Sequence, residues 1–168
     1  MQAYNNVRTA SGTGEGSGPF ISFHEGFKGL PAWAGFFPNS DRTSLDIHPY
    51  LCFSGQSAEG YAQRTTDPCT AWGPAQNDSM SAYGLTTAGE FSNAINDCGQ
   101  WVNGVNLGTR YEGDYPGGPW PRIGSCDQWT DYSQWNDTMK QDIQQFALAS
   151  MDALQVRKRW HRTAGISS

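Results

Sequence analysis

The sequence lacks long apolar runs, and this shortage argues against a membrane-spanning helix. None of its 168 residues lies in a stretch that approaches the roughly 20 apolar residues of a membrane-spanning helix. The opening residues, MQAYNNVRTA, have neither the basic start nor the apolar centre of a signal peptide. We therefore expect no membrane segment and no signal peptide in this chain.

Charge is also scarce, at 16% of residues, and the formal net charge is −5. Binding to a phosphate backbone depends on clustered Lys and Arg, so we predict no nucleic-acid partner. The few charges are unevenly placed: residues 1–155 hold 7 basic and all 16 acidic residues, whereas residues 156–168 hold 4 basic and none acidic. We interpret 1–155 as one domain and 156–168 as an unrelated basic tail.

Cysteine is limited to four positions: 52, 69, 98 and 126. No CxxC spacing with histidine partners suggests zinc, so we predict no metal. Four cysteines allow three full pairings, and disulfides are the favoured interpretation. Two glycosylation sequons, Asn77-Asp78-Ser79 and Asn136-Asp137-Thr138, also favour an oxidising, secretory compartment.

Gly, Pro and aromatic residues are abundant and indicate a folded, loop-rich domain. Three segments favour β-structure: FISFH, TSLDIHPYLCFSG and GLTTAG. Pro49 cannot donate to a strand ladder, so regular pairing of the second segment should end near it. His48 and Tyr50 would then lie at the C-terminal end of that strand.

Helical spacing is visible in two segments. Between residues 91 and 102, apolar side chains fall on one helical face, and Asn103-Gly104 would end this helix. A final helix would present Ile143, Phe146, Ala147, Met151 and Leu154 on one face. AYNNVRTA could form the end of a further helix, which the Gly-rich SGTGEGSGP then stops. We predict that residues 55–83 form a polar loop.

Strands separated by helices and long connections imply parallel crossovers and an α/β fold. An eight-unit β/α barrel needs about 250 residues, so this chain can hold only part of one, or a smaller fold. In such a barrel the active site lies at the C-terminal ends of the strands, where His24, His48, Tyr50 and Glu90 fall. A carboxylate among aromatic residues suits the cleavage of a sugar.

Each of these residues also has a purely structural interpretation. Glu90 could be a first-turn carboxylate favoured by the dipole of a following helix. His48 and His24 could be hydrogen-bonded structural residues. Both interpretations stay open at this stage.

Several blocks of sequence nevertheless occur together and in order: GPFISFHEGF, WAGFFPNSDRTSLDIHPYLCFSGQ, AGEFSNAINDCGQWVNG, GTRYEG and WPRIGSC. They resemble consecutive blocks of the fungal exo-β-1,3-glucanases, the glucan 1,3-β-glucosidases of glycoside hydrolase family 5. The resemblance covers roughly residues 3–155. It implies the C-terminal half of a (β/α)8 TIM barrel, with about strands 5 to 7 and their helices, and no cofactor.

The resemblance assigns roles to particular residues. It implies that Glu90, in GEFS, is the catalytic nucleophile and that His48 and Tyr50, in HPY, line the glucose subsite. Arg110 is a weaker candidate that would support the site from a following loop. Cys98 and Cys126 match positions that pair in relatives, whereas Cys52 and Cys69 stay unassigned.

The family is also expected to use an acid/base glutamate in an Asn-Glu-Pro motif, which these 168 residues do not contain. Glu15 and Glu25 are in the wrong context to replace it. We therefore expect an inactive fragment of a secreted or cell-wall enzyme, monomeric, with β-glucan as its partner. The alternatives are a non-catalytic carbohydrate-binding protein and a small disulfide-stabilised secreted interaction protein.

Overall fold

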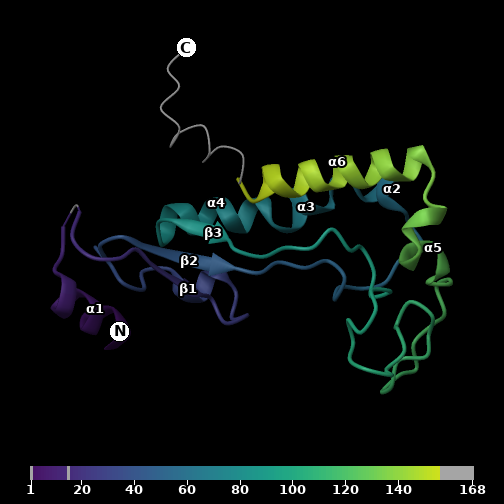
Figure 1. Ribbon diagram of the computed structural model, residues 1–168, viewed down its shortest axis with the longest axis horizontal. Helices are drawn as coiled ribbons and strands as arrows, with labels where there is room; N and C mark the ends of the chain where they lie inside the picture. The colour runs from purple at the N-terminus through teal and green to yellow at the C-terminus, as the bar shows by residue number, and fades with distance from the viewer. Residues whose placement is uncertain (1, 15, 156–168) are drawn as a thin grey trace, which may run out of the picture.

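The computed structural model describes residues 2–14 and 16–155; the predicted basic tail lies outside the described residues. Helix α1 (Gln2–Ser11) lies at one end of the molecule, and the long loops between β3 and α5 lie at the other (Figure 1). Between them lies a small sheet with helices along one side. Over the described residues, no helix has the length and apolar character to cross a membrane.

The sheet has three parallel strands in the order β1-β2-β3: Ile21–His24, Thr43–Ile47 and Thr86–Ala88. This confirms the three predicted strands and the α/β class. Pairing of β2 ends at Ile47, two residues before Pro49, as the missing backbone N–H predicted. His48 and Tyr50 therefore lie in the loop that follows β2.

The two faces of the sheet differ because strand side chains alternate. On one face, Leu45 and Ile47 are buried, and Ile47 joins a core with Leu51, Trp72, Ile95, Phe146 and Leu154. The other face carries polar side chains, and Ser44 Oγ donates to Ser22 Oγ at 2.9 Å. Helices cover the apolar face. The polar face carries Asp46, which lies next to the polar residues that follow the strand ends.

Residues 55–83 are not the polar loop that was predicted. They contain α2 (Tyr61–Arg64), α3 (Asp67–Ala71) and α4 (Gly73–Ala82). The apolar period is missing because polar side chains face inward from α4: buried Gln76 donates from Nε2 to the carbonyl of Thr86 at 3.0 Å, and Ser79 Oγ lies 2.6 Å from Thr86 Oγ1.

The helix predicted over residues 91–102 is also wrong, although Ile95 and Cys98 are buried as its pattern suggested. Side chains here bond to nearby backbone and compete with helical hydrogen bonds. Asn96 Oδ1 accepts from the Cys98 N–H at 3.2 Å, and Ser92 Oγ accepts from the Ala94 N–H at 3.0 Å. An apolar period alone did not distinguish a helix from a packed irregular segment.

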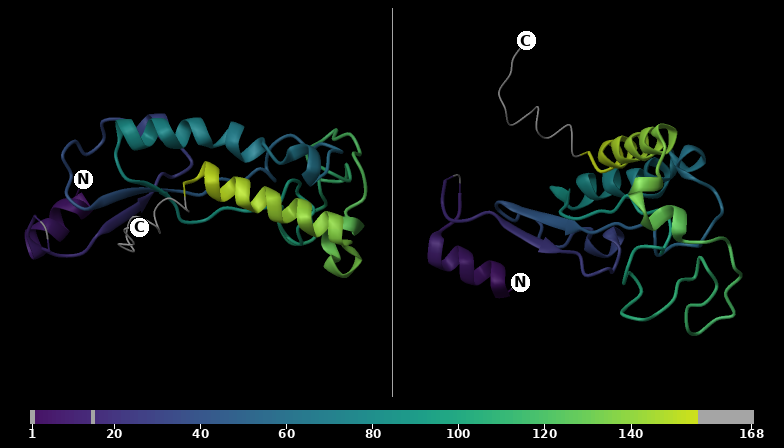
Figure 2. Two further views of the ribbon diagram at one scale, coloured as in Figure 1. Left: turned by 90° about the horizontal axis from the view of Figure 1, so that it is seen from above. Right: turned by 45° about the vertical axis from the view of Figure 1, so that its right-hand side comes forward.

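The final helix is confirmed as α6 (Asp137–Ala153), with Phe146 fully buried and Leu154 buried just beyond its end. Asn136 caps it by accepting from the Met139 N–H at 2.9 Å. α6 packs along α2 and α3, on the same side of the sheet as α4 (Figures 1 and 2). Shorter elements are α5 (Asp127–Thr130), η1 (Leu30–Trp33) and η2 (Tyr132–Gln134).

Candidate functional site

The polar residues at the strand ends meet because neighbouring parallel strands end at the same edge of the sheet. Ile47 is paired with Ala88, so the residues that follow each strand start side by side. His48 and Tyr50 follow β2, and Glu90 follows β3. The structure thus brings together three of the four residues that the sequence singled out at this edge; the fourth, His24, contacts the His48 ring.

Tyr50 and Glu90 are joined directly, since the phenolic hydroxyl of Tyr50 donates to Oε1 of Glu90. This hydrogen bond is the main reason why the pKa of Tyr50 is raised to about 12, with a smaller effect of burial. The Glu90 side chain remains 60% exposed. Its carboxylate is therefore oriented by the phenol and still accessible.

His48 lies between two carboxylates. Its Nδ1 is 3.9 Å from Oε2 of Glu90, and its Nε2 is 3.3 Å from Oδ2 of Asp46. The ring also contacts His24, with 4.3 Å between ring centroids. His24 accepts from the Gly26 N–H through Nδ1 and contacts His48 rather than Glu90. Asp46 was missed by sequence reasoning, although it lies at the end of β2, two residues before His48 and four before Tyr50.

A hollow of about 390 Å³ lies beside this group. Glu90 and Tyr50 line it together with apolar and aromatic side chains; its lining consists of Tyr50, Cys52, Phe53, Glu90, Phe91, Ser92, Ala94 and Val102. Phe53 is 53% exposed. The hollow thus combines one accessible carboxylate with flat apolar surfaces, a combination suited to a sugar ring.

Glu90 is not a first-turn helix residue. The segment that follows it forms no helix, so a helix dipole does not explain the carboxylate. This removes the simplest structural interpretation of Glu90 and leaves its contacts with Tyr50 and His48.

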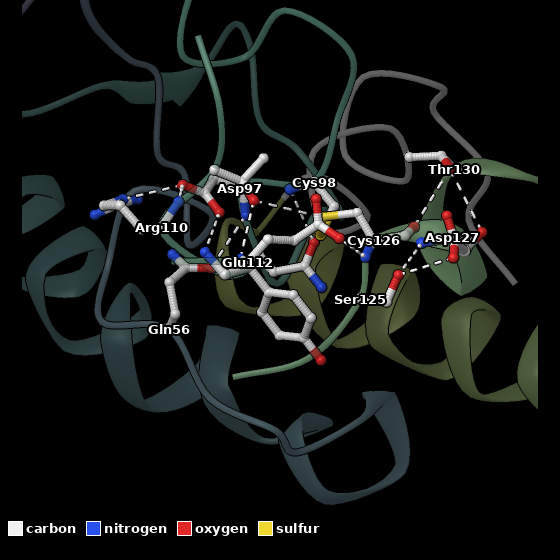
Figure 3. The surroundings of a disulfide bond; sticks show 12 residues. Gln56, Asp97, Cys98, Arg110, Glu112, Ser125, Cys126, Asp127 and Thr130 are labelled. Carbon is white, nitrogen blue, oxygen red and sulfur yellow. Dashed lines mark hydrogen bonds and ion pairs between the residues drawn. A yellow bond between two sulfur atoms is a disulfide. The ribbon is translucent and has the colours of Figure 1, made fainter. Parts of the chain in front are cut away.

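Arg110 lies beside Asp97 (Figure 3) and bonds to the backbone of two residues that line the hollow. Its guanidinium donates to the carbonyl oxygens of Cys52 at 2.9 Å and Phe53 at 3.0 Å, and its Nε donates to Asp97 at 3.1 Å. The structure places Arg110 against the backbone of two hollow-lining residues rather than against Glu90.

Asp97, which sequence reasoning also missed, is completely buried. Burial raises its pKa, but hydrogen bonds from Asn103, Arg110 and Tyr111 outweigh burial, and the net pKa is lowered. Nothing in its local sequence distinguished it from a surface aspartate, because its donors come from residues 6 to 14 positions away.

The predicted disulfide between Cys98 and Cys126 is present (Figure 3). Cys52 and Cys69 are unpaired, so none of the full four-cysteine pairings forms. Cys52 is buried, which raises the pKa of its thiol, and Cys69 is exposed. Within residues 2–14 and 16–155, no group of three or more His, Cys, Asp or Glu side chains could hold a metal ion.

No family model matches this chain, but it is similar to several fungal glucan 1,3-beta-glucosidases. It is 30% identical over 151 residues to the glucan 1,3-beta-glucosidase of Lachancea kluyveri, covering 86% of this chain and 34% of the relative. Glucan 1,3-beta-glucosidase 2 of Wickerhamomyces anomalus is 30% identical over 166 residues, or 95% of this chain and 37% of the relative.

A sporulation-specific glucan 1,3-beta-glucosidase of Saccharomyces cerevisiae is also 30% identical, over 154 residues that make up 86% of this chain and 33% of the relative. The chain thus spans about a third of the length of these three curated relatives. These similarities confirm the resemblance that the motifs indicated: over most of its length, the chain is related to the fungal glucan 1,3-beta-glucosidases.

Proposed function

We propose that this chain is the nucleophile-bearing part of a retaining glycoside hydrolase of family 5 that releases glucose from β-1,3-glucans. The observation that carries the proposal is the accessible Glu90 carboxylate, which lines a hollow with aromatic walls, accepts from Tyr50 and lies 3.9 Å from Nδ1 of His48. The names of the similar fungal proteins supply the substrate class.

In a retaining mechanism a carboxylate attacks the anomeric carbon and forms a glycosyl-enzyme, which water then hydrolyses. We assign this attack to Glu90. The Tyr50 hydroxyl would orient the attacking carboxylate, and His48 and Tyr50 would also contact the hydroxyl groups of glucose. Arg110 would act indirectly, by fixing the backbone of Cys52 and Phe53 at the wall of the hollow.

The same mechanism needs a second carboxyl about 5 to 5.5 Å from the nucleophile, to protonate the leaving oxygen. Asp46 contacts Nε2 of the His48 ring, and this ring lies between Asp46 and Glu90. Glu25 is buried, and its Oε2 accepts from the Gly29 N–H at 2.9 Å. Neither is free for that role. We therefore propose that the chain alone does not turn over glucan.

We further propose that β1, β2 and β3 correspond to strands 5 to 7 of an eight-stranded β/α barrel. The parallel order and the position of the site at the C-terminal strand ends support this. The Cys98–Cys126 disulfide supports an oxidising compartment, and hence a secreted or cell-wall enzyme.

A glucoside with a very good leaving group tests Glu90 without the missing acid, because such a leaving group departs unprotonated. We expect 2,4-dinitrophenyl 2-deoxy-2-fluoro-β-glucoside to add one fluoroglucosyl group to the purified chain, at Glu90 by peptide mass spectrometry. Glu90→Gln should remain unlabelled, and exposed Asp78→Asn should be labelled normally. Labelling elsewhere, or unchanged labelling of Glu90→Gln, would contradict the assignment.

A non-catalytic carbohydrate-binding protein is the second candidate, favoured by the exposure of Phe53 (53%) and Trp101 (64%). Saturable binding of laminarin without covalent labelling, and unaffected by Glu90→Gln, would support it. Ordinary release of glucose from laminarin by the chain would instead reject the proposal that it lacks an acid.

A further inference from the structure

The carboxylate of Asp46, in β2, is seated against the end of β3. Its Oδ1 accepts from the Gly89 N–H at 2.6 Å. Its carboxyl carbon lies 2.8 Å from the position that a Cβ on residue 89 would occupy, which is closer than real Cβ contacts allow. The residue before Glu90 is thus a glycine at a point where any larger side chain would displace Asp46.

The other oxygen of Asp46 is connected to the Glu90 carboxylate through the His48 ring. Oδ2 lies 3.3 Å from Nε2 of His48, whose Nδ1 lies 3.9 Å from Oε2 of Glu90. Asp46 is therefore linked to Glu90 once through the backbone of Gly89 and once through an imidazole. Its side chain is 22% exposed, whereas that of Glu90 is 60% exposed, so Asp46 is the more enclosed of the two carboxylates.

We propose that Asp46 is a positioning residue for Glu90: by holding Gly89 and His48, it keeps the Glu90 carboxylate against Tyr50. Asp46 acts only through these neighbours. Its importance for sugar cleavage rests on the proposed function, but the position of Glu90 can be measured without any turnover. A merely structural Asp46 would change stability and leave the Tyr50–Glu90 contact intact.

Tyr50 provides the measurement. Its pKa of about 12 depends first on the hydrogen bond to Glu90, then on burial and on the charges of Glu90 and Cys52. If Glu90 moves away, the pKa of Tyr50 should fall toward the ordinary tyrosine value near 10. Tyr61 is an internal control, because its pKa is also about 12 but is raised by burial.

The experiment follows the ¹³Cζ signals of labelled tyrosines with pH in the full chain, with Tyr50 assigned by Tyr50→Phe. At about pH 11, Tyr50 of the unaltered chain should be largely protonated and Tyr50 of Asp46→Ala largely ionised. Glu90→Ala, which removes the acceptor of the Tyr50 hydroxyl, should give the same shift as Asp46→Ala. Tyr61 should stay protonated in all three proteins, which shows that the fold is retained.

Two further variants separate the routes. Gly89→Ala should also lower the pKa of Tyr50, because the added Cβ displaces Asp46. Asp46→Asn keeps an oxygen for the Gly89 N–H and should retain most of the raised pKa, whereas Asp78→Ala should retain all of it. A Tyr50 pKa that stays near 12 in Asp46→Ala or Gly89→Ala, with Tyr61 unchanged, would overturn the proposal.

This result is independent of the labelling experiment. If Glu90 is never labelled yet Asp46→Ala shifts Tyr50, the positioning role stands and the proposed reaction is wrong. If Glu90 is labelled and Asp46→Ala leaves Tyr50 unchanged, the reaction stands and the positioning role is wrong.

Discussion

Two carboxylates, Glu90 and Asp97, lie seven residues apart and have opposite surroundings. Asp97 is fully buried and accepts from Asn103, from the backbone N–H groups of Arg110 and Tyr111, and from the Arg110 side chain. Glu90 is 60% exposed and bonded to Tyr50, with His48 near its other oxygen. Asp97 has its hydrogen-bonding capacity filled by the protein, whereas Glu90 retains capacity for a ligand.

The difference indicates a division of tasks within a short stretch of chain. The Asp97 loop, which we define as residues 96–111, is fixed by buried polar contacts and by the disulfide that joins its Cys98 to Cys126. The strand-end cluster, which we define as Asp46, His48, Tyr50 and Glu90, is partly exposed. We expect changes in the loop to alter stability and changes at Glu90 to leave it nearly unchanged.

The largest effect should come from Asp97→Ala. It leaves the Arg110 guanidinium and two backbone N–H groups without their buried acceptor, and breaking such a pair typically costs about 3 to 5 kcal/mol. Urea unfolding should show this loss, while Asp78→Ala should change the free energy of unfolding by less than about 0.5 kcal/mol. A loss below about 1 kcal/mol for Asp97→Ala would contradict the comparison.

Removing the disulfide should have the next largest effect. Cys98 and Cys126 are 28 residues apart, and a loop of that length corresponds to about 3 to 4 kcal/mol of chain entropy. Cys98→Ser with Cys126→Ser should lower the free energy of unfolding by that amount. Exposed Cys69→Ser is the matched control and should leave it unchanged.

A smaller effect should appear on acidification. Because the pKa of Asp97 is lowered in the folded protein, its contribution to stability is present above the ordinary value of 3.8 and is lost as the pH falls through the lowered pKa. Urea unfolding between about pH 6 and pH 2 should show a steeper loss for the unaltered chain than for Asp97→Asn. Equal slopes would show that Asp97 does not govern this loss.

The smallest effect on stability should come from Glu90→Gln, with a change in the free energy of unfolding of less than about 0.5 kcal/mol. The Tyr50 hydroxyl keeps an acceptor in glutamine, and the side chain is mostly exposed. Thermal unfolding of the two proteins should therefore nearly coincide. A loss as large as that of Asp97→Ala would mean that Glu90 serves mainly to stabilise the fold.

Local pattern was enough for features in which neighbouring residues decide the conformation. The strand before Pro49 ends where the missing N–H requires, and the apolar face around Phe146 forms α6. It failed between residues 55 and 83, because α4 buries the polar residues Gln76 and Ser79 and so shows no apolar period. It also failed between residues 91 and 102, where side chains hydrogen-bond to nearby backbone and no helix forms.

The sequence by itself determined three strands, a parallel sheet, the Cys98–Cys126 pair by resemblance, and four candidates at one edge: His24, His48, Tyr50 and Glu90. Only the tertiary structure decided that Asp97 is buried, that Arg110 bonds to the wall of the hollow, and that Asp46 is seated on Gly89. These contacts join segments up to 58 residues apart in sequence. Their partners are set by how strands and loops pack, so no local spacing could specify them.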